Sequence, residues 1–156
     1  ISSNSKQTIF HLTNSSGGDE LTIFLSGTTG SPFHVSLTGS STGIFRHEQI
    51  GSSPTTSSLS SWNHYAISFK SASSGVQTKL YVNGRLDSTD TLGTTGVNTL
   101  KQKGTIGFIA SGSAGFLSAS MDEFRFWKTE RDAFQIGTNL KYNTRCVLQI
   151  QRRDNR

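Results

Sequence analysis

Two adjacent carboxylates, Asp122 and Glu123, are the residues with the most potential for catalytic chemistry. Retaining hydrolysis of a glycosidic bond needs two carboxyl groups about 5 Å apart on either side of one sugar. Neighbouring residues on a strand point to opposite faces of the sheet, so these two cannot act on the same sugar. We therefore predict that the protein is not an enzyme.

Asp122 could instead hold a metal or organise the backbone. Alternation along the predicted strand Ser118–Trp127 places Asp122 on the same face as Phe124 and Phe126. An ionised carboxylate on an apolar face must be paired, hydrogen-bonded or metal-bound to offset its desolvation. Asp122 is therefore either a metal ligand or an acceptor for loop N–H groups that holds the strand in place. The other candidate ligands fall in separate predicted strands without the spacing of a metal cluster: His11, His34 and His47.

Three side chains on outward strand faces are candidates for a carbohydrate platform: Trp127, Tyr81 and Arg125. An outward aromatic ring beside a charged group can stack on a sugar and donate to its hydroxyls. A sheet also uses such side chains to cover its own surface, so both interpretations stay open. Trp62 and His64, which open a predicted strand, could act on a sugar in the same way or serve the fold.

The stretches that must position these residues are short strands separated by turn residues. Asn83-Gly84 lies between two apolar runs and is the preferred two-residue turn of a β-hairpin. Glu130–Ile136 is the only helical candidate, and it is too short to be stable alone. The predicted strands are Gln7–Leu12, Leu21–Leu25, Phe33–Leu37, Ile44–Ile50, Trp62–Lys70, Gln77–Val82, Arg85–Thr91, Gly104–Ile109 and Ser118–Trp127.

Alternation within these strands indicates one packed face and one wet face. In Trp62–Lys70, for example, Tyr65, Ile67 and Phe69 share a face. Antiparallel strands of this kind bury the apolar face against a second sheet, so we predict an all-β sandwich of two antiparallel sheets.

The composition of the chain limits its domain organisation and the classes of partner that we expect it to bind. With 156 residues it has the size of one domain, and its single cysteine, Cys146, excludes an internal disulfide. Most of the formal charge of +5 comes from the residues after position 140, where five basic residues are balanced by only one acidic residue, Asp154. The rest of the chain is almost neutral, so we expect no nucleic-acid partner. No apolar stretch is long enough to predict a membrane span.

Three segments, in this order, carry a resemblance to a known family: Trp62-Asn-His-Tyr-Ala-Ile-Ser-Phe69, Lys79-Leu-Tyr-Val-Asn-Gly-Arg85 and Gly115-Phe-Leu-Ser-Ala-Ser-Met-Asp-Glu-Phe-Arg-Phe-Trp127. Together they resemble the concanavalin A-like lectin and glucanase superfamily, in its laminin G-like and pentraxin-like branch. The resemblance implies a jelly-roll sandwich over 1–139, with 140–156 as a basic tail or extra strand around Ile150. Strands usual in the family before Gln7 are not visible, which predicts an open sheet edge.

The resemblance also bears on function. Glucan-cleaving members carry Glu-x-Asp-x-Glu or Glu-x-Asp-x-x-Glu, and neither occurs here. Members often bind Ca²⁺ through carboxylates and backbone carbonyls, which implies a site with Asp122 and either Asp19 or a nearby loop carbonyl. It assigns Trp62 to the rim of the sandwich and His64 to a bond with a neighbouring carbonyl. Rim loops that would bind a sugar are Ser52–Ser61, Gly93–Asn98 and Ser111–Gly115.

We therefore expect a non-catalytic module that recognises a glycan or glycosylated surface, in an extracellular, cell-surface or virion-surface protein. The alternative is a structural module that packs against neighbouring domains or subunits without binding sugar, and a fragment of a glycoside hydrolase is the third. Fold alone does not separate these functions.

Overall fold

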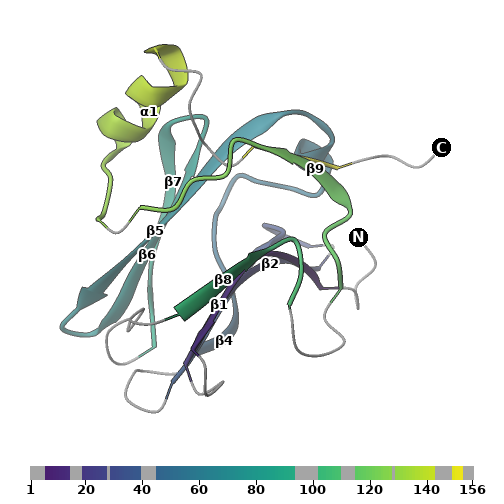
Figure 1. Ribbon diagram of the computed structural model, residues 1–156. Coiled ribbons are helices and arrows are strands. Elements are labelled where there is room, and N and C mark those ends of the chain that lie inside the picture. The colour runs from purple at the N-terminus through teal and green to yellow at the C-terminus, as the bar shows by residue number, and fades with distance from the viewer. Residues whose placement is uncertain are drawn as a thin grey trace.

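The structure is a computed structural model that describes residues 6–14, 19–27, 29–39, 45–93, 102–109, 115–127, 129–142 and 149–152. Its ten strands form two antiparallel sheets (Figure 1). The strands are β1 Gln7–Asn14, β2 Glu20–Leu25, β3 Phe33–Thr38, β4 Phe45–Gln49, β5 Asn63–Ala72, β6 Gly75–Val82, β7 Arg85–Leu92, β8 Gln102–Ile106, β9 Ala119–Asp122 and β10 Gln149–Arg152.

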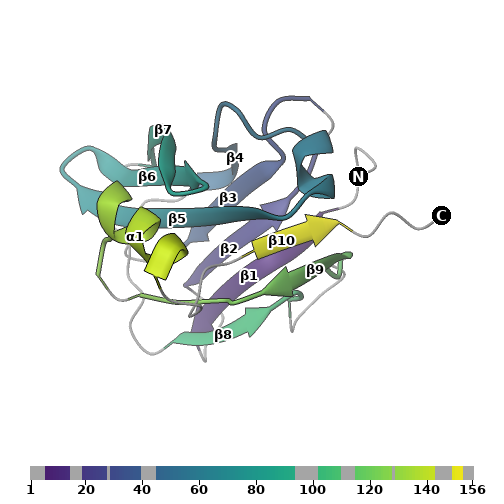
Figure 2. The ribbon, with the colours of Figure 1, turned by 90° about the horizontal axis from the view of Figure 1, so that it is seen from above.

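The strand order is β4-β3-β2-β1-β8 in the first sheet and β7-β6-β5-β10-β9 in the second. Consecutive strands form hairpins wherever the connection is short, as in β5–β6 and β6–β7. The second sheet is completed from far along the chain, because β10 lies between β5 and β9 (Figure 2). The expected extra strand around Ile150 is therefore present, while Cys146 and Leu148 lie outside the described residues.

The core lies between the two sheets, as the alternation predicted. Ile9 and Phe33 from the first sheet meet Tyr65 and Leu80 from the second, and all four are almost fully buried. The rings of Phe33 and Tyr65 are 4.6 Å apart and join the two layers directly. Burial of such side chains contributes about 1.5–3 kcal/mol each, so this layer provides most of the stability.

The predicted hairpin at Asn83-Gly84 is confirmed. Both residues have positive φ, 50° and 78°, which is the backbone of a type I′ turn. The turn joins β6 to β7 with Val82 opposite Arg85.

The predicted strand Ser118–Trp127 is much too long. β9 ends at Asp122, where the Oδ1 atom of Asp122 accepts a hydrogen bond from the N–H of Glu123 at 2.9 Å. Glu123 has φ 55°, and this left-handed residue ends the extended backbone. The expected alternation therefore stops there: Phe124 still packs against the core, whereas Phe126 is largely exposed.

The described residues contain one α-helix, α1, which spans Ala133–Tyr142 and begins later than the predicted Glu130–Ile136, and a short 3-10 helix at Ser57–Ser60. Asp132 precedes it and caps it, since its Oδ1 atom accepts a hydrogen bond from the N–H of Gln135 at 2.7 Å. The helix lies over the outward face of the β5–β7 strands (Figures 1 and 2). No helix in the described parts of the chain is long and apolar enough to cross a membrane.

Candidate functional site

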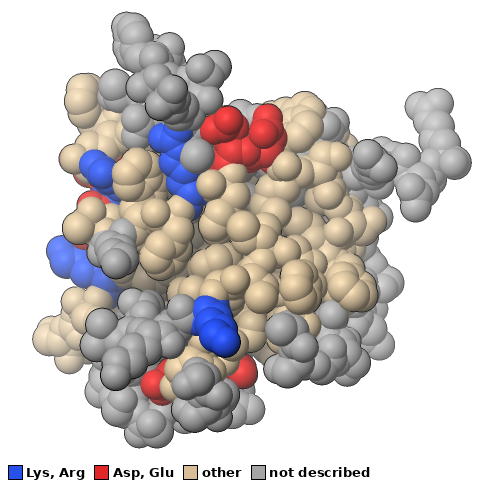
Figure 3. Space-filling view, in the orientation of Figure 1, with Lys and Arg blue, Asp and Glu red and all other residues tan. Residues whose placement is uncertain are grey.

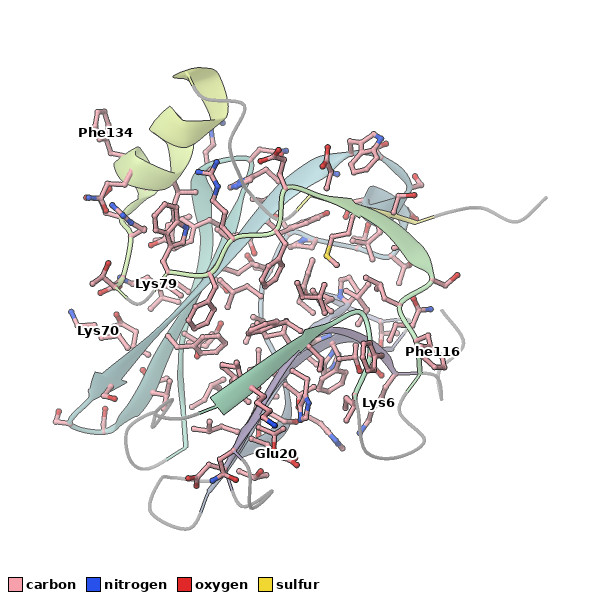
Figure 4. The ribbon with its side chains drawn as sticks, viewed as in Figure 1. Lys6, Glu20, Lys70, Lys79, Phe116 and Phe134 are labelled. Atoms are coloured by element: carbon pink, nitrogen blue, oxygen red, sulfur yellow. The ribbon has the colours of Figure 1, made fainter. Side chains whose placement is uncertain are left out.

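Residues 123–127 follow β9 and carry two of the three predicted platform residues, and residues 129–136 then lie against the outward face of the second sheet. Glu130 fastens this segment to the sheet, because its Oε1 lies 2.7 Å from the Nζ of Lys79 and its Oε2 lies 3.4 Å from the Nζ of Lys70. Figure 4 shows both lysines on the same side of the molecule as α1. Hydrogen bonding to Lys79 lowers the pKa of Glu130, and the same bond raises the pKa of Lys79.

Trp127 forms the centre of an aromatic and cationic group with two arginines. The guanidinium carbon of Arg131 lies 4.3 Å from the centre of the Trp127 ring, and that of Arg125 lies 5.8 Å from it. The indole remains 44% exposed. We call these three residues the Trp127 cluster.

The two arginines of this cluster differ in their partners. Arg125 has a carboxylate neighbour, since its Nη2 atom lies 4.0 Å from Glu123. The Nε of Arg131 is buried and has no hydrogen-bond acceptor among the described residues. Because this Nε is not exposed, what Arg131 can offer a ligand is the positive charge of its guanidinium beside the Trp127 ring. Residue patterns did not single out Arg131, because its contact with Trp127 forms in an irregular segment before α1.

The structure does not make Tyr81 available for stacking. Tyr81 points outward from β6 as predicted, but it is only 3% exposed. The prediction of Tyr81 as a ligand-binding residue is therefore wrong, because its burial leaves no ring surface for a ligand to stack on.

The two aspartates proposed for calcium each accept a hydrogen bond from a residue nearby in the chain. Asp122 is exposed at the end of β9, so the premise of a buried carboxylate is wrong. Asp19 precedes β2 in the other sheet, where its carbonyl oxygen accepts the N–H of Asn14 and its Oδ2 accepts the Nδ2–H of Asn14, both at 3.1 Å. Among the described residues no group of three or more His, Cys, Asp or Glu side chains could hold a metal ion. The described residues therefore do not form a Ca²⁺ site, and we derive no chemistry through this ion.

Trp62 and His64, which were considered together as a pair, differ in their exposure to solvent. Trp62 is half exposed just before β5, whereas His64 is buried with neither ring nitrogen hydrogen-bonded to a described residue. The expectation that the His64 side chain bonds a carbonyl is therefore wrong. Burial lowers the pKa of His64 to about 4, so the imidazole is neutral near pH 7.

One shallow hollow of ≈ 460 Å³ lies beside the β6–β7 turn, lined by Ser53, Val82, Asn83, Arg85, Leu86 and Asp87. Its carboxylate is already used: the Oδ2 of Asp87 accepts the N–H of Ser52 at 2.7 Å, and the Oδ1 accepts the N–H of Ser53 at 3.1 Å. Asp87 thus holds part of the loop Ser52–Ser61 against β7. The other two predicted rim loops, Gly93–Asn98 and Ser111–Gly115, lie outside the described residues except for Gly93 and Gly115.

A second exposed surface lies where β8 and β9 end the two sheets, and no sequence pattern indicated it. Four apolar side chains are between 40% and 77% exposed there, and we call them the aromatic side: Ile106, Phe108, Phe116 and Phe126. The rings of Phe108 and Phe116 are 6.4 Å apart, and the ring of Phe126 is 5.7 Å from that of the buried Phe10. Figure 3 looks onto this part of the molecule and shows a broad area of uncharged side chains.

Comparison with protein families gives a match over residues 1–137 to a laminin G-like family, described as the concanavalin A-like lectin/glucanases superfamily. The chain belongs to this family. The match covers both sheets except β10, which lies beyond the matched residues. No curated protein and no solved structure matches the chain.

Laminin G-like domains are generally non-catalytic. In the acidic pair considered first, Asp122 accepts a hydrogen bond from the N–H of Glu123, and the Glu123 carboxylate lies near Arg125. Family membership thus establishes a lectin-like β-sandwich module and leaves its ligand to be inferred from the surfaces.

Proposed function

We propose that the protein is a non-catalytic recognition module that binds an acidic glycan at the Trp127 cluster. The observation that carries the proposal is the indole of Trp127, which is 44% exposed and has the guanidinium groups of Arg131 and Arg125 beside its ring. A sugar ring stacks on aromatic surface, and a carboxylate or sulfate on that sugar pairs with the guanidinium charge. Charge-assisted hydrogen bonds of this kind contribute about 1.5–3 kcal/mol.

Glycan arrays probed with the wild type and with the variants Trp127→Ala, Arg131→Gln and Trp62→Ala test this proposal. We expect the protein to bind uronic acid-containing or sulfated glycans and to leave their neutral counterparts unbound. Trp127→Ala and Arg131→Gln should each weaken binding by about tenfold or more, as the loss of 1.5–3 kcal/mol implies. Trp62→Ala is the matched control, because Trp62 is 48% exposed and Trp127 is 44% exposed.

Two results would refute the glycan proposal. One is an array on which the folded protein binds no acidic glycan. The other is a loss of binding in Trp62→Ala as large as that in Trp127→Ala.

The aromatic side supports a second candidate function, a structural module that packs against another protein. Exposed apolar side chains that adjoin one another are rare on monomeric proteins and mark association surfaces. This surface is separate in chemistry from the Trp127 cluster, since its members carry no charge.

A further inference from the structure

We propose that Glu123 competes with acidic ligands for Arg125 and thereby makes the Trp127 cluster selective for glycans that carry a single acidic group. This inference rests on the proposed function and names a residue that sets the specificity of the same site.

The two arginines of the cluster are not equally available to an anion. The Oε2 atom of Glu123 lies 4.0 Å from the Nη2 atom of Arg125, so this guanidinium already faces a carboxylate. Arg131 has no ion pair among the described residues. Its acidic neighbours in the chain are engaged elsewhere, since Glu130 pairs with two lysines and Asp132 caps α1. The cluster therefore offers an incoming anion one uncompensated positive charge, that of Arg131.

The backbone places Glu123 beside Arg125. The φ of Glu123 is 55°, in the left-handed region that residues other than glycine rarely occupy, and Asp122 accepts its N–H at 2.9 Å. Backbone conformations of this kind are found most often at ligand sites, where the surrounding structure holds them. The Glu123 side chain is 39% exposed, so an approaching ligand meets its carboxylate before it can reach Arg125, which is only 17% exposed.

The positions of the two guanidinium groups determine what one glycan can contact. Their central carbons lie 4.3 Å and 5.8 Å from the centre of the same indole ring, so a short glycan stacked on Trp127 can contact both. An acidic group near Arg131 meets an unopposed positive charge. A second acidic group near Arg125 is repelled by Glu123 and has to displace it. The site should therefore gain affinity from the first acidic group and little from the second.

Titration calorimetry on the full 156-residue chain tests the inference, with N-acetyllactosamine that carries no sulfate, one sulfate or two sulfates as the probes. The wild type should bind the two sulfated forms with similar dissociation constants and the neutral form more weakly. Glu123→Gln should tighten binding of the disulfated form by about two- to fivefold, as expected when one exposed ion pair no longer competes. The same variant should leave binding of the monosulfated form nearly unchanged.

Two further variants separate this effect from a change in net charge. Glu48→Gln is the matched control, because Glu48 is also exposed and lies on β4 in the other sheet. It removes the same charge and should tighten binding of neither sulfated form. The gain in Glu123→Gln should disappear in the double variant with Arg125→Gln, which should still bind the monosulfated form through Arg131. Circular dichroism checks that each variant is folded.

The inference is overturned if Glu123→Gln gives no gain or an equal gain for both sulfated forms, if Glu48→Gln gives the same gain, or if the gain persists in the double variant. In each of these cases the wild type still binds an acidic glycan, and the proposed function stands. A wild type that binds neither sulfated form also overturns the inference. The uronic acid-containing glycans of the array then decide the proposed function separately.

Discussion

Asn83 and His64 hold each other by two hydrogen bonds: the N–H of Asn83 donates to the carbonyl oxygen of His64 at 2.8 Å, and the N–H of His64 donates to the Oδ1 of Asn83 at 2.9 Å. In the second bond the acceptor is the side-chain oxygen of Asn83, whereas between the strands of a sheet the acceptor is ordinarily a backbone carbonyl oxygen. The β6–β7 turn is thereby fastened to the beginning of β5, and the stability of three strands depends on one asparagine.

Replacing Asn83 should separate its two contributions. Asn83→Ala removes the side-chain bonds to His64 and Asn63 and forces alanine into φ 50°, so we expect a loss of about 2–4 kcal/mol in the free energy of unfolding. Asn83→Gly keeps the backbone conformation accessible and should lose only about 1–2 kcal/mol. Urea unfolding at neutral pH measures both, and equal losses in the two variants would contradict a cost from the backbone.

His64 should make the protein less stable in acid. Its pKa is about 4 in the folded protein, because burial disfavours the charged imidazole, against 6.5 in the unfolded chain. Between these values the unfolded chain binds more protons, so stability falls as the pH is lowered from 6.5 to about 4.

The loss attributable to His64 over this range is about 3 kcal/mol. His64→Leu cannot bind the proton and should show a shallower decline in urea unfolding between pH 7 and 4. His11 is also buried and its pKa is also lowered, so some dependence should remain. An unchanged pH dependence in His64→Leu would rule out His64 as its source.

Asp87 should matter for stability through the loop it binds. Asp87→Ala leaves the N–H groups of Ser52 and Ser53 without their acceptor, and we expect a loss of about 1–3 kcal/mol in thermal or urea unfolding. Asp90→Ala on the same strand is the control, because the Asp90 carboxylate accepts only the hydroxyl of Ser88 among the bonds seen. The control should lose clearly less than Asp87→Ala.

The Glu130 ion pairs should affect one segment more than the whole fold. Glu130→Gln removes the charge that faces Lys79 and Lys70, and pairs this exposed contribute about 0.2–1 kcal/mol. We expect amide exchange to quicken in residues 129–136 while the midpoint of urea unfolding scarcely moves. The wild-type protection should weaken in high salt and as the carboxylate protonates in acid. Equal acceleration throughout the core would contradict this local role.

Local pattern was sufficient for most of the fold. The Asn83-Gly84 turn and the inward alternation around Tyr65 depend on residues close together in the chain, so their geometry was predictable. The end of β9 was not predictable, because the left-handed backbone that ends it occurs at Glu123 and not at a glycine, which would have indicated it in the sequence.

The candidate surface was less predictable than the fold. Alternation indicates which way Tyr81 points but not how deeply it is buried. The contact between Arg131 and Trp127 forms in an irregular segment, where no period relates side chains to faces. The aromatic side arises where residues around Ile106 and Phe116 meet Phe126 at two sheet edges, which only the tertiary structure brings together.

The position of β10 has a consequence for how the protein is made. Residues 149–152 lie between β5 and β9, so until they are synthesised the second sheet has a gap one strand wide and β9 has no neighbour among the described strands. The nascent chain can form the β5–β7 hairpins early, yet the sheet closes only after these last strand residues have left the ribosome. Until residues 149–152 are in place, the open gap is where a chaperone or another strand would bind first.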